Sequence, residues 1–303
     1  MFKVCIISCG MIANSAHIPA FKQFGEDYEI VGVCDVNENA ARETAERHGI
    51  ANYYTDAKEM LSKEKPDVVS VCVPNCFHKE YTIMALDSKL VGEPIKLRYI
   101  NGHTGPLGKG AKHRGVSDNA EEMTDEQRGK TWWHKDELGG GVFLDIACYG
   151  CFFSRWFMGE NAKSVISVGA NLNTPFGNTD DNFAAAIKYD GKMSVIEGTW
   201  STPRAVIPSG PMVLCTDGVI MCTGGAENAP DVKAFDIYGN EVEIPEIEFG
   251  DKFKNMPCQY ANHISKGEDI YPMLTLEMNM EVMAILDATI KSAKSGKEEK
   301  IRD

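Results

Sequence analysis

The first 35 residues constrain the fold more than any other stretch of the chain. They open on a short apolar run rich in β-branched residues, Phe2–Ser8, which predicts a buried strand. A turn containing Gly10 follows, then a helix-like segment, and then a second apolar run, Glu29–Cys34, that ends on Asp35. Strand, glycine turn, helix, strand and terminal acid together make the first half of a dinucleotide-binding unit.

The glycine turn departs from the usual G-x-G-x-x-G/A pattern. It reads Ser8-Cys9-Gly10-Met11-Ile12-Ala13, with serine at the first glycine and an accepted alanine at the third. Because Gly10 has no Cβ, its backbone can approach a pyrophosphate, and the unpaired amides of the following helix would bind the anion. An ordinary strand–helix turn is the alternative, which the context disfavours. The predicted cofactor-binding residues of this half are Ser8, Gly10, Met11, Ile12 and Asp35.

The alternation of helix and strand continues after Asp35. Asn37 is expected to cap a helix that Gly49 ends, and the run 68–73 is apolar on both faces, as a central parallel strand requires. Ligands of doubly wound sheets bind at the carboxyl ends of strands. We therefore add Pro74, Asn75 and His78 to the predicted cofactor site, with helix capping as the alternative role of the last two.

The second part of the chain has a different pattern. A strand is expected over 95–99, a polar loop over 101–130 and a helix over 144–158. The last helix, about 275–295, has an apolar stripe expected to pack in the core. Strands joined by tight turns are predicted at 164–171, 182–189, 192–199, 211–216 and 219–222. The stripe consists of Leu276, Met280, Met283 and Ile290.

Composition excludes several classes of partner. The 303 residues carry a formal net charge of −13, which argues against nucleic acid or an anionic membrane as the main partner. No apolar run approaches the roughly 20 residues that span a bilayer, and no signal peptide is evident, so the cytoplasm is the expected location. Cys148 and Cys151 form one C-x-x-C pair, but no second pair completes a zinc site, so no metal is predicted.

Several short motifs, in this order, resemble the Gfo/Idh/MocA oxidoreductases, typified by glucose–fructose oxidoreductase and inositol dehydrogenase. The resemblance covers nearly the full length. Its motifs are Cys9-Gly10-Met11-Ile12-Ala13, Cys34-Asp35-Val36-Asn37, Val73-Pro74-Asn75 with His78, Gly92-Glu93-Pro94, Gly139-Gly140-Gly141 followed by Asp145 and Tyr149, and Ser292-Ala293-Lys294-Ser295-Gly296-Lys297.

The resemblance implies an α/β fold with an N-terminal Rossmann domain, here 1–91. It also implies a C-terminal α+β domain, here 92–303, with a large, open, mostly antiparallel sheet that supports homodimers or homotetramers. The implied activity is hydride transfer between a nicotinamide cofactor and a hydroxyl carbon of a sugar, polyol or sugar acid. Asp35 favours NAD, because its carboxylate would repel the 2′-phosphate of NADP; NADP stays the alternative.

The implied catalytic residues are Asp145 and Tyr149, which fall on the D-x-x-x-H/Y motif of the family. Spaced i and i+4, they share one face of a helix. Asp145 would accept a hydrogen bond from the substrate hydroxyl, and Tyr149 would pass on its proton. A free tyrosine has a pKa of about 10, so it needs a neighbouring cation near neutral pH. Core packing beside Phe152 is the alternative role of Tyr149.

One family segment is missing between Ser88 and Lys89. It normally carries a Glu-Lys-Pro motif, and Glu93-Pro94 lacks its lysine. Without that segment, the strand at 68–73 would lie at an apolar sheet edge, which favours aggregation. Three hypotheses follow: an oxidoreductase; a catalytically inactive dinucleotide- or sugar-binding homologue without the lysine; and, less favoured, a purely structural oligomer.

Overall fold

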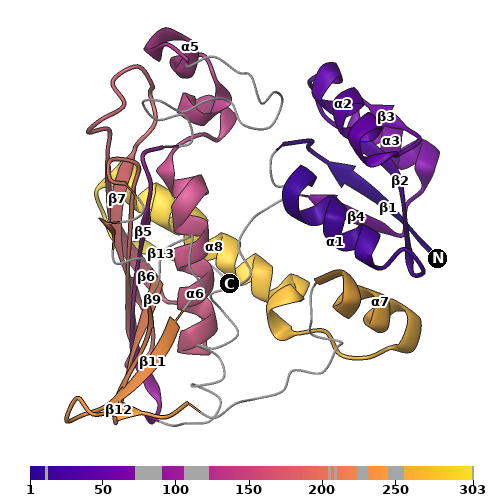
Figure 1. Ribbon diagram of the computed structural model, residues 1–303. Coiled ribbons are helices and arrows are strands. Elements are labelled where there is room, and N and C mark those ends of the chain that lie inside the picture. The colour runs from indigo at the N-terminus through magenta and orange to yellow at the C-terminus, as the bar shows by residue number, and fades with distance from the viewer. Residues whose placement is uncertain are drawn as a thin grey trace. The chain divides into compact units, whose positions relative to one another are not determined.

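The chain forms two compact units in the computed structural model (Figure 1). The structure describes residues 1–10, 13–71, 91–105, 123–203, 206–207, 210–223, 231–244 and 256–301. The first unit contains residues 1–71 and 256–271 of this set, and the second contains the others.

A parallel sheet of four strands forms the centre of the first unit. The strand order is β3-β2-β1-β4, and every neighbouring pair is parallel. This is one half of a doubly wound sheet, as the sequence predicts. The strands are β1 (Phe2–Ile7), β2 (Tyr28–Cys34), β3 (Tyr53–Tyr54) and β4 (Val68–Val71).

Helices cover both faces of this sheet. The larger core includes Ile6 of β1, Phe21 of α1 and Ala41 of α2, whereas Met60 of α3 packs with Cys5 and Cys34 on the opposite face. The helical segments are the π-helix η1 (Ala13–His17), α1 (Ile18–Gln23), α2 (Glu38–His48) and α3 (Ala57–Glu64). The predicted ends of α2 are confirmed: the Asn37 side chain accepts from two backbone amides, and Gly49 adopts a left-handed conformation.

A helix from much later in the chain completes the larger core. In α7 (Met256–Lys266), Ala261 is buried in the same cluster as Phe21 and Tyr28. The Tyr28 hydroxyl also donates to the Pro257 carbonyl. No sequence pattern predicted this helix. Among the described residues, β4 pairs only with β1, and Val69 on β4 is 40% exposed.

The second unit is built on a nine-stranded sheet with the order β12-β11-β10-β9-β5-β8-β7-β6-β13. Neighbouring strands are antiparallel except for β5 and β8, so the predicted large and mostly antiparallel sheet is confirmed. The strands are β5 (Pro94–Gly102), β6 (Ser164–Ala170), β7 (Asn182–Lys188), β8 (Met193–Thr199), β9 (Gly210–Cys215), β10 (Gly218–Thr223), β11 (Asp231–Asp236), β12 (Glu241–Val242) and β13 (Glu299–Lys300).

Two long helices cover one face of this sheet (Figure 1): α6 (Cys148–Met158) packs on β5 and β8, and α8 (Leu276–Ser295) packs on β6. Shorter helical segments lie at 125–129 (α5), 132–134 (η2), 136–138 (η3), 143–147 (η4) and 272–274 (η7). The loop predicted over 101–130 is therefore partly wrong. Residues 101–102 extend β5, and Thr124 begins α5 with a capping box.

The predicted core face of α8 is wrong for three of its four residues, and the fourth, Ile290, is half-buried. Leu276, Met280 and Met283 are 72%, 61% and 54% exposed. The buried residues lie on the opposite face of the helix: Val282, Ile285, Leu286, Ala288, Thr289 and Ser292. None of the helices in the described ranges is both long and apolar enough to cross a bilayer.

Candidate functional site

The turn after β1 has the backbone geometry of a glycine-rich loop. Ser8, at the first glycine position, adopts a φ of 79°, a left-handed conformation that glycine takes without strain. Among the described residues, a Cβ added at Gly10 would contact only the Ser8 hydroxyl, at an ordinary van der Waals distance of 3.8 Å. The glycine is therefore not needed for packing within the described chain, and its position suits a ligand that approaches the backbone.

Asp35 is linked directly to this turn. Its Oδ2 accepts from the Cys9 backbone amide at 2.9 Å, and its Oδ1 accepts from the Asn37 amide at 2.9 Å. The acid at the end of β2 and the turn at the end of β1 thus lie side by side, as parallel neighbouring strands require. This is where an adenosine ribose lies in a Rossmann unit.

Asn14 also stabilises this turn, although no sequence pattern identified it. Its Nδ2 donates to the carbonyls of Cys9 (2.9 Å) and Gly10 (3.0 Å) and to the Thr44 hydroxyl (3.1 Å). Its Oδ1 lies 3.0 Å from His48 Nε2. Burial, with help from the nearby Lys22, lowers the pKa of His48. No short motif marks Asn14, because its role depends on three segments that meet only in the fold.

The other predicted cofactor residues, Met11, Ile12, Pro74, Asn75 and His78, lie outside the described residues. So does the junction between Ser88 and Lys89. Within the described residues, the left-handed turn, the open position at Gly10 and the acid hydrogen-bonded to the turn fit a dinucleotide.

Asp145, the first predicted catalytic residue, lies in the π-helical segment η4 at the start of α6. The glycines before it permit a tight approach. A Cβ at Gly140 would lie 2.4 Å from the carbonyl oxygens of Trp132 and Trp133, and Gly141 has a φ of 101°. Short π-helical segments occur often at functional sites.

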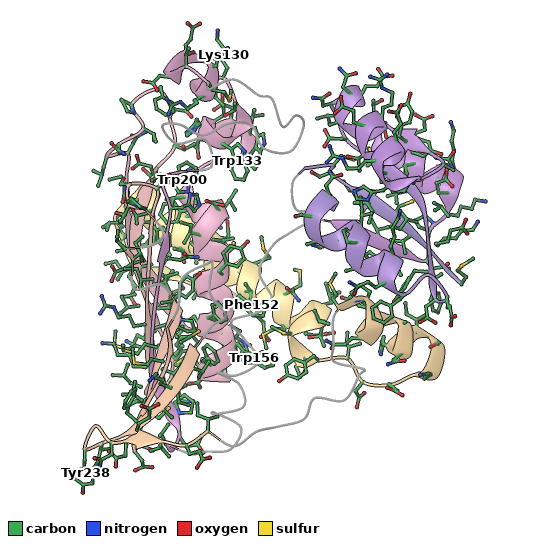
Figure 2. All side chains as sticks on the ribbon, viewed as in Figure 1. Lys130, Trp133, Phe152, Trp156, Trp200 and Tyr238 are labelled. Carbon is green, nitrogen blue, oxygen red and sulfur yellow. The ribbon has the colours of Figure 1, made fainter. Side chains whose placement is uncertain are left out.

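The Asp145 carboxylate is held by two aromatic rings from distant parts of the chain. Its Oδ2 accepts from Trp200 Nε1 at 2.7 Å and lies 2.8 Å from His103 Nε2. Trp200 is buried, whereas the side chains of His103 and Asp145 are 31% and 21% exposed. Figure 2 shows Trp200 and Trp133 at the end of the sheet where α6 begins, with Phe152 and Trp156 further along α6.

His103 and Trp200 were missed because no motif contains them. His103 directly follows β5 and Trp200 directly follows β8, and these strands are separated by 90 residues in the numbering (Gly102 to Met193 at their nearest ends). His103 lay four residues beyond the strand predicted over 95–99 and inside the predicted loop, so no predicted strand end marked it. Only the pairing of the two strands brings both rings to one carboxylate.

Tyr149, the second predicted catalytic residue, lies in the first turn of α6 and is partly buried. It follows Asp145 by less than one turn of a π-helix, so both residues lie on the same side of the helical segment. Its proton-transfer role stays a prediction.

Burial raises the pKa of Cys148, in the same turn, to about 12 and also raises the pKa of Cys151, which disfavours a reactive thiolate at either position.

Two family models match the chain. One describes an oxidoreductase family with an NAD-binding Rossmann fold, Gfo/Idh/MocA, and matches residues 2–91. The other describes the Gfo/Idh/MocA C-terminal domain and matches residues 85–221. Together they extend from the first strand to within β10.

Among characterised proteins, the chain is similar to D-glucoside 3-dehydrogenase of Escherichia coli (strain K12), with 43% identity over 86 residues. This match covers 28% of the chain and spans only 24% of the relative's length. D-xylose 1-dehydrogenase (NADP(+)) 2 of Haloferax volcanii is 21% identical over 325 residues, covering 96% of this chain and 97% of the relative. That alignment is longer than the 303-residue chain, so it includes positions at which this chain has no residue.

The fold also matches solved structures. The crystal structure of myo-inositol 2-dehydrogenase from Lactobacillus plantarum superposes with a TM-score of 0.68 at 18% sequence identity, covering 99% of both chains. At this identity the likeness establishes the fold alone.

Proposed function

Because this chain belongs to the Gfo/Idh/MocA family of oxidoreductases, we propose that it transfers hydride between a nicotinamide cofactor and a hydroxyl carbon of a sugar, polyol or sugar acid. The observation that carries the proposal is the Asp145 carboxylate. Two ring N–H donors anchor its Oδ2, while its Oδ1 has no hydrogen-bond partner in the described part of the chain. An anchored carboxylate with one open oxygen suits a substrate hydroxyl.

Each site residue has a stated role in this proposal. Asp145 accepts a hydrogen bond from the substrate and orients the reacting carbon, and Tyr149 passes on the proton of the reacting hydroxyl. Gly10 admits the pyrophosphate to the turn, and Asp35 accepts from the ribose hydroxyls. The bound nicotinamide supplies a hydride acceptor or donor. The similarity to sugar dehydrogenases supports the substrate class.

We further propose that NAD is preferred over NADP. Asp35 already accepts two backbone amides, which hold its carboxylate beside the turn. A fixed carboxylate at that position repels a 2′-phosphate. Calorimetric titration with NADH and then NADPH tests this preference, and tighter binding of NADPH would refute it.

The decisive test of the nucleotide site uses Gly10→Ala. Because a Cβ at Gly10 would make only an ordinary van der Waals contact, with the Ser8 hydroxyl at 3.8 Å, this variant should unfold at the same temperature as the wild type. Its affinity for NADH should nevertheless fall at least tenfold, since the methyl group occupies the approach to the backbone. A screen of sugars and polyols, followed by NADH absorbance, then tests turnover. Unchanged NADH affinity in Gly10→Ala would contradict the proposed site.

The second candidate is a homologue that binds a dinucleotide or a sugar without turnover. The absence of the Glu-Lys-Pro lysine from the sequence and the strained Ser8 in the turn favour it. The two candidates differ in one measurement. The non-catalytic homologue binds NADH, but it reduces no NAD to NADH with any sugar in the screen.

We propose a homodimer or homotetramer assembled through the nine-stranded sheet. The face of the sheet opposite α6 and α8 exposes apolar side chains, with Ile166, Val168 and Met193 at 51%, 65% and 39%. Apolar patches on a sheet face favour association. Light scattering coupled to size-exclusion chromatography should give at least twice the mass of one chain. The double variant Ile166→Glu, Val168→Glu should lower that mass, and a monomeric wild type would contradict the assembly.

A further inference from the structure

We propose that His103 is the base that receives the hydroxyl proton at this site, with Asp145 and Trp200 as the residues that position it. This inference rests on the proposed function and deepens it, because it names the group on which the hydroxyl proton ends. The first observation is the contact between the His103 ring and the Asp145 carboxylate. A carboxylate only accepts hydrogen bonds, so the 2.8 Å contact at His103 Nε2 requires a proton on that nitrogen.

The contact therefore sets the tautomer of His103. In a neutral imidazole, a proton on Nε2 leaves a lone pair on Nδ1, and Nδ1 becomes the basic atom. No described residue hydrogen-bonds to Nδ1. With 31% of its side chain exposed, His103 is anchored on one side and open to a ligand on the other. The same division of roles between a carboxylate and the two ring nitrogens operates in catalytic triads.

Strand pairing positions His103 beside Trp200. The strands β5 and β8 are the one parallel pair of this sheet in the described ranges, and Gly102 pairs with Thr199. Parallel strands end at the same edge, so the next residues, His103 and Trp200, emerge together. The His103 amide also donates to the Thr199 carbonyl at 3.0 Å.

A glycine permits this close approach. A Cβ at Gly102 would lie 2.5 Å from the Thr199 side chain and 2.6 Å from its carbonyl oxygen, which forces a shift of the strand ends. The strand ends can therefore meet at this distance only because residue 102 has no side chain.

Trp200 is held firmly in place and in turn holds the Asp145 carboxylate. Its indole is 1% exposed and stacks with the His103 ring, with centroids 6.4 Å apart and planes inclined by 28°. Its backbone amide donates to the Asp181 carbonyl at 2.8 Å. The Asp181 carboxylate is fully buried and accepts from the amides of Leu172 and Asn173 at 2.7 Å. These contacts hold the indole, and through it Asp145 Oδ2, in one place.

The reaction balances as follows. In the oxidative direction, the carbon-bound hydrogen leaves with both bonding electrons to the oxidised nicotinamide, and the hydroxyl carbon becomes a carbonyl. The hydroxyl proton, passed on by Tyr149, ends on Nδ1 of His103, so the ring becomes an imidazolium. Its new positive charge lies beside the Asp145 carboxylate, which stabilises it. In the reductive direction the same imidazolium returns the proton to the carbonyl oxygen.

The first test needs no turnover. Two-bond proton–nitrogen NMR correlations of the wild-type protein, labelled at histidine nitrogen, distinguish the two neutral tautomers of His103. The signal is assigned by comparison with His103→Gln. We expect the proton on Nε2 in the wild type and a mixture of tautomers in Asp145→Ala. A wild-type spectrum with the proton on Nδ1 would overturn the proposal.

The second test measures kinetics with the substrate found in the sugar screen. His103→Gln should lower kcat by roughly 10²- to 10⁴-fold, the usual contribution of a general base, and remove the acid limb of the pH–rate profile. NADH affinity should stay unchanged. The matched control is His263→Gln, which alters an exposed histidine on α7. Full activity in His103→Gln, or loss of kcat with an unchanged pH profile, would refute the base role.

The two tests separate this inference from the proposed function. If the wild type binds NADH but turns over no substrate, the proposed function fails, and the base role fails with it. If the wild type is active and His103→Gln keeps its kcat and pH profile, the oxidoreductase stands and only the base role is lost.

Discussion

At the scale of single residues, the turn after β1 contains one position of backbone strain. Ser8 has a φ of 79° where a typical loop has glycine, and such a conformation costs a residue with a side chain about 1–3 kcal/mol. Lys65, at the end of α3, has a φ of 46° and is the other described non-glycine residue with a positive φ.

Replacements at Ser8 should reveal this strain. Ser8→Val should lower the free energy of unfolding by about 1–3 kcal/mol, because a β-branched side chain fits positive φ poorly. Ser8→Gly should change it by less than about 1 kcal/mol, since relief of strain is offset by the greater freedom of glycine in the unfolded chain. Urea unfolding measures both. Lys65→Gly is the matched control away from the turn, and Ser8→Val with wild-type stability would contradict the assignment of strain.

Burial at His134 predicts a pH effect on stability. This side chain is 1% exposed, packs edge-on against Trp200 and Phe176, and has no hydrogen-bond partner for either ring nitrogen among the residues described. Burial, followed by the nearby Arg128, lowers its pKa below 6.5. The unfolded chain therefore binds a proton at a higher pH than the folded chain does.

Stability should consequently fall as pH drops below about 6.5, by at most about 1.4 kcal/mol per pH unit from this residue. His134→Phe should flatten that decline, which thermal unfolding between pH 5 and pH 7 would show. His263→Phe, at an exposed site, should leave the decline as it is. An identical slope in His134→Phe and wild type would exclude His134 as the cause.

At the scale of elements, sequence patterns predicted ends and types better than buried faces. Asn37 and Gly49 mark the ends of α2 because capping is a local interaction. The buried face of α8 could not be read in the same way, because the helix carries apolar residues on two opposite faces. Tertiary packing chose Val282, Ile285 and Leu286 rather than Met280 and Met283.

This choice of face is testable on α8 itself. Ile285→Ala should cost about 2–5 kcal/mol of unfolding free energy, because it leaves a cavity at a site that is 1% exposed. Met283→Ala, on the same helix at 54% exposure, should change the value by no more than about 0.5 kcal/mol. Urea unfolding of the two variants makes the comparison. Equal losses would mean that the Met283 face is buried too.

The candidate site shows the same contrast between local motifs and contacts that depend on the fold. Asp145 and the glycine turn were predictable, since each belongs to a short motif within one segment. The contacts of His103 and Trp200 with Asp145 were not, because they depend on the register between β5 and β8, which no local pattern encodes. Asn14 was missed because its contacts also join segments that are separated in the sequence.

At the scale of the whole molecule, the chain returns to its first unit after building most of the second. Residues 256–271 belong with the N-terminal strands, and Ala261 is 5% exposed in their core. The stability of the nucleotide-binding unit therefore depends on a helix that lies near the other end of the sequence.

A charge at Ala261 should expose this dependence. Ala261→Glu should destabilise the first unit by roughly 2–4 kcal/mol, because it buries an unpaired carboxylate. Hydrogen exchange followed by mass spectrometry should show faster exchange in β1 and β2 and unchanged exchange in β7 and β8. His263→Glu, exposed on the same helix, is the control. Faster exchange confined to α7 would contradict the shared core.

The parallel pairing of β5 with β8 has a consequence for how members of this family diverge. Backbone hydrogen bonds between β5 and β8 determine where His103 and Trp200 meet, so their meeting point depends on the main chain. Side chains elsewhere in the sheet can be substituted without displacing the two rings, provided that this pairing is kept. Selection can therefore alter which molecules are accepted while the contacts of the two rings with Asp145 are inherited unchanged.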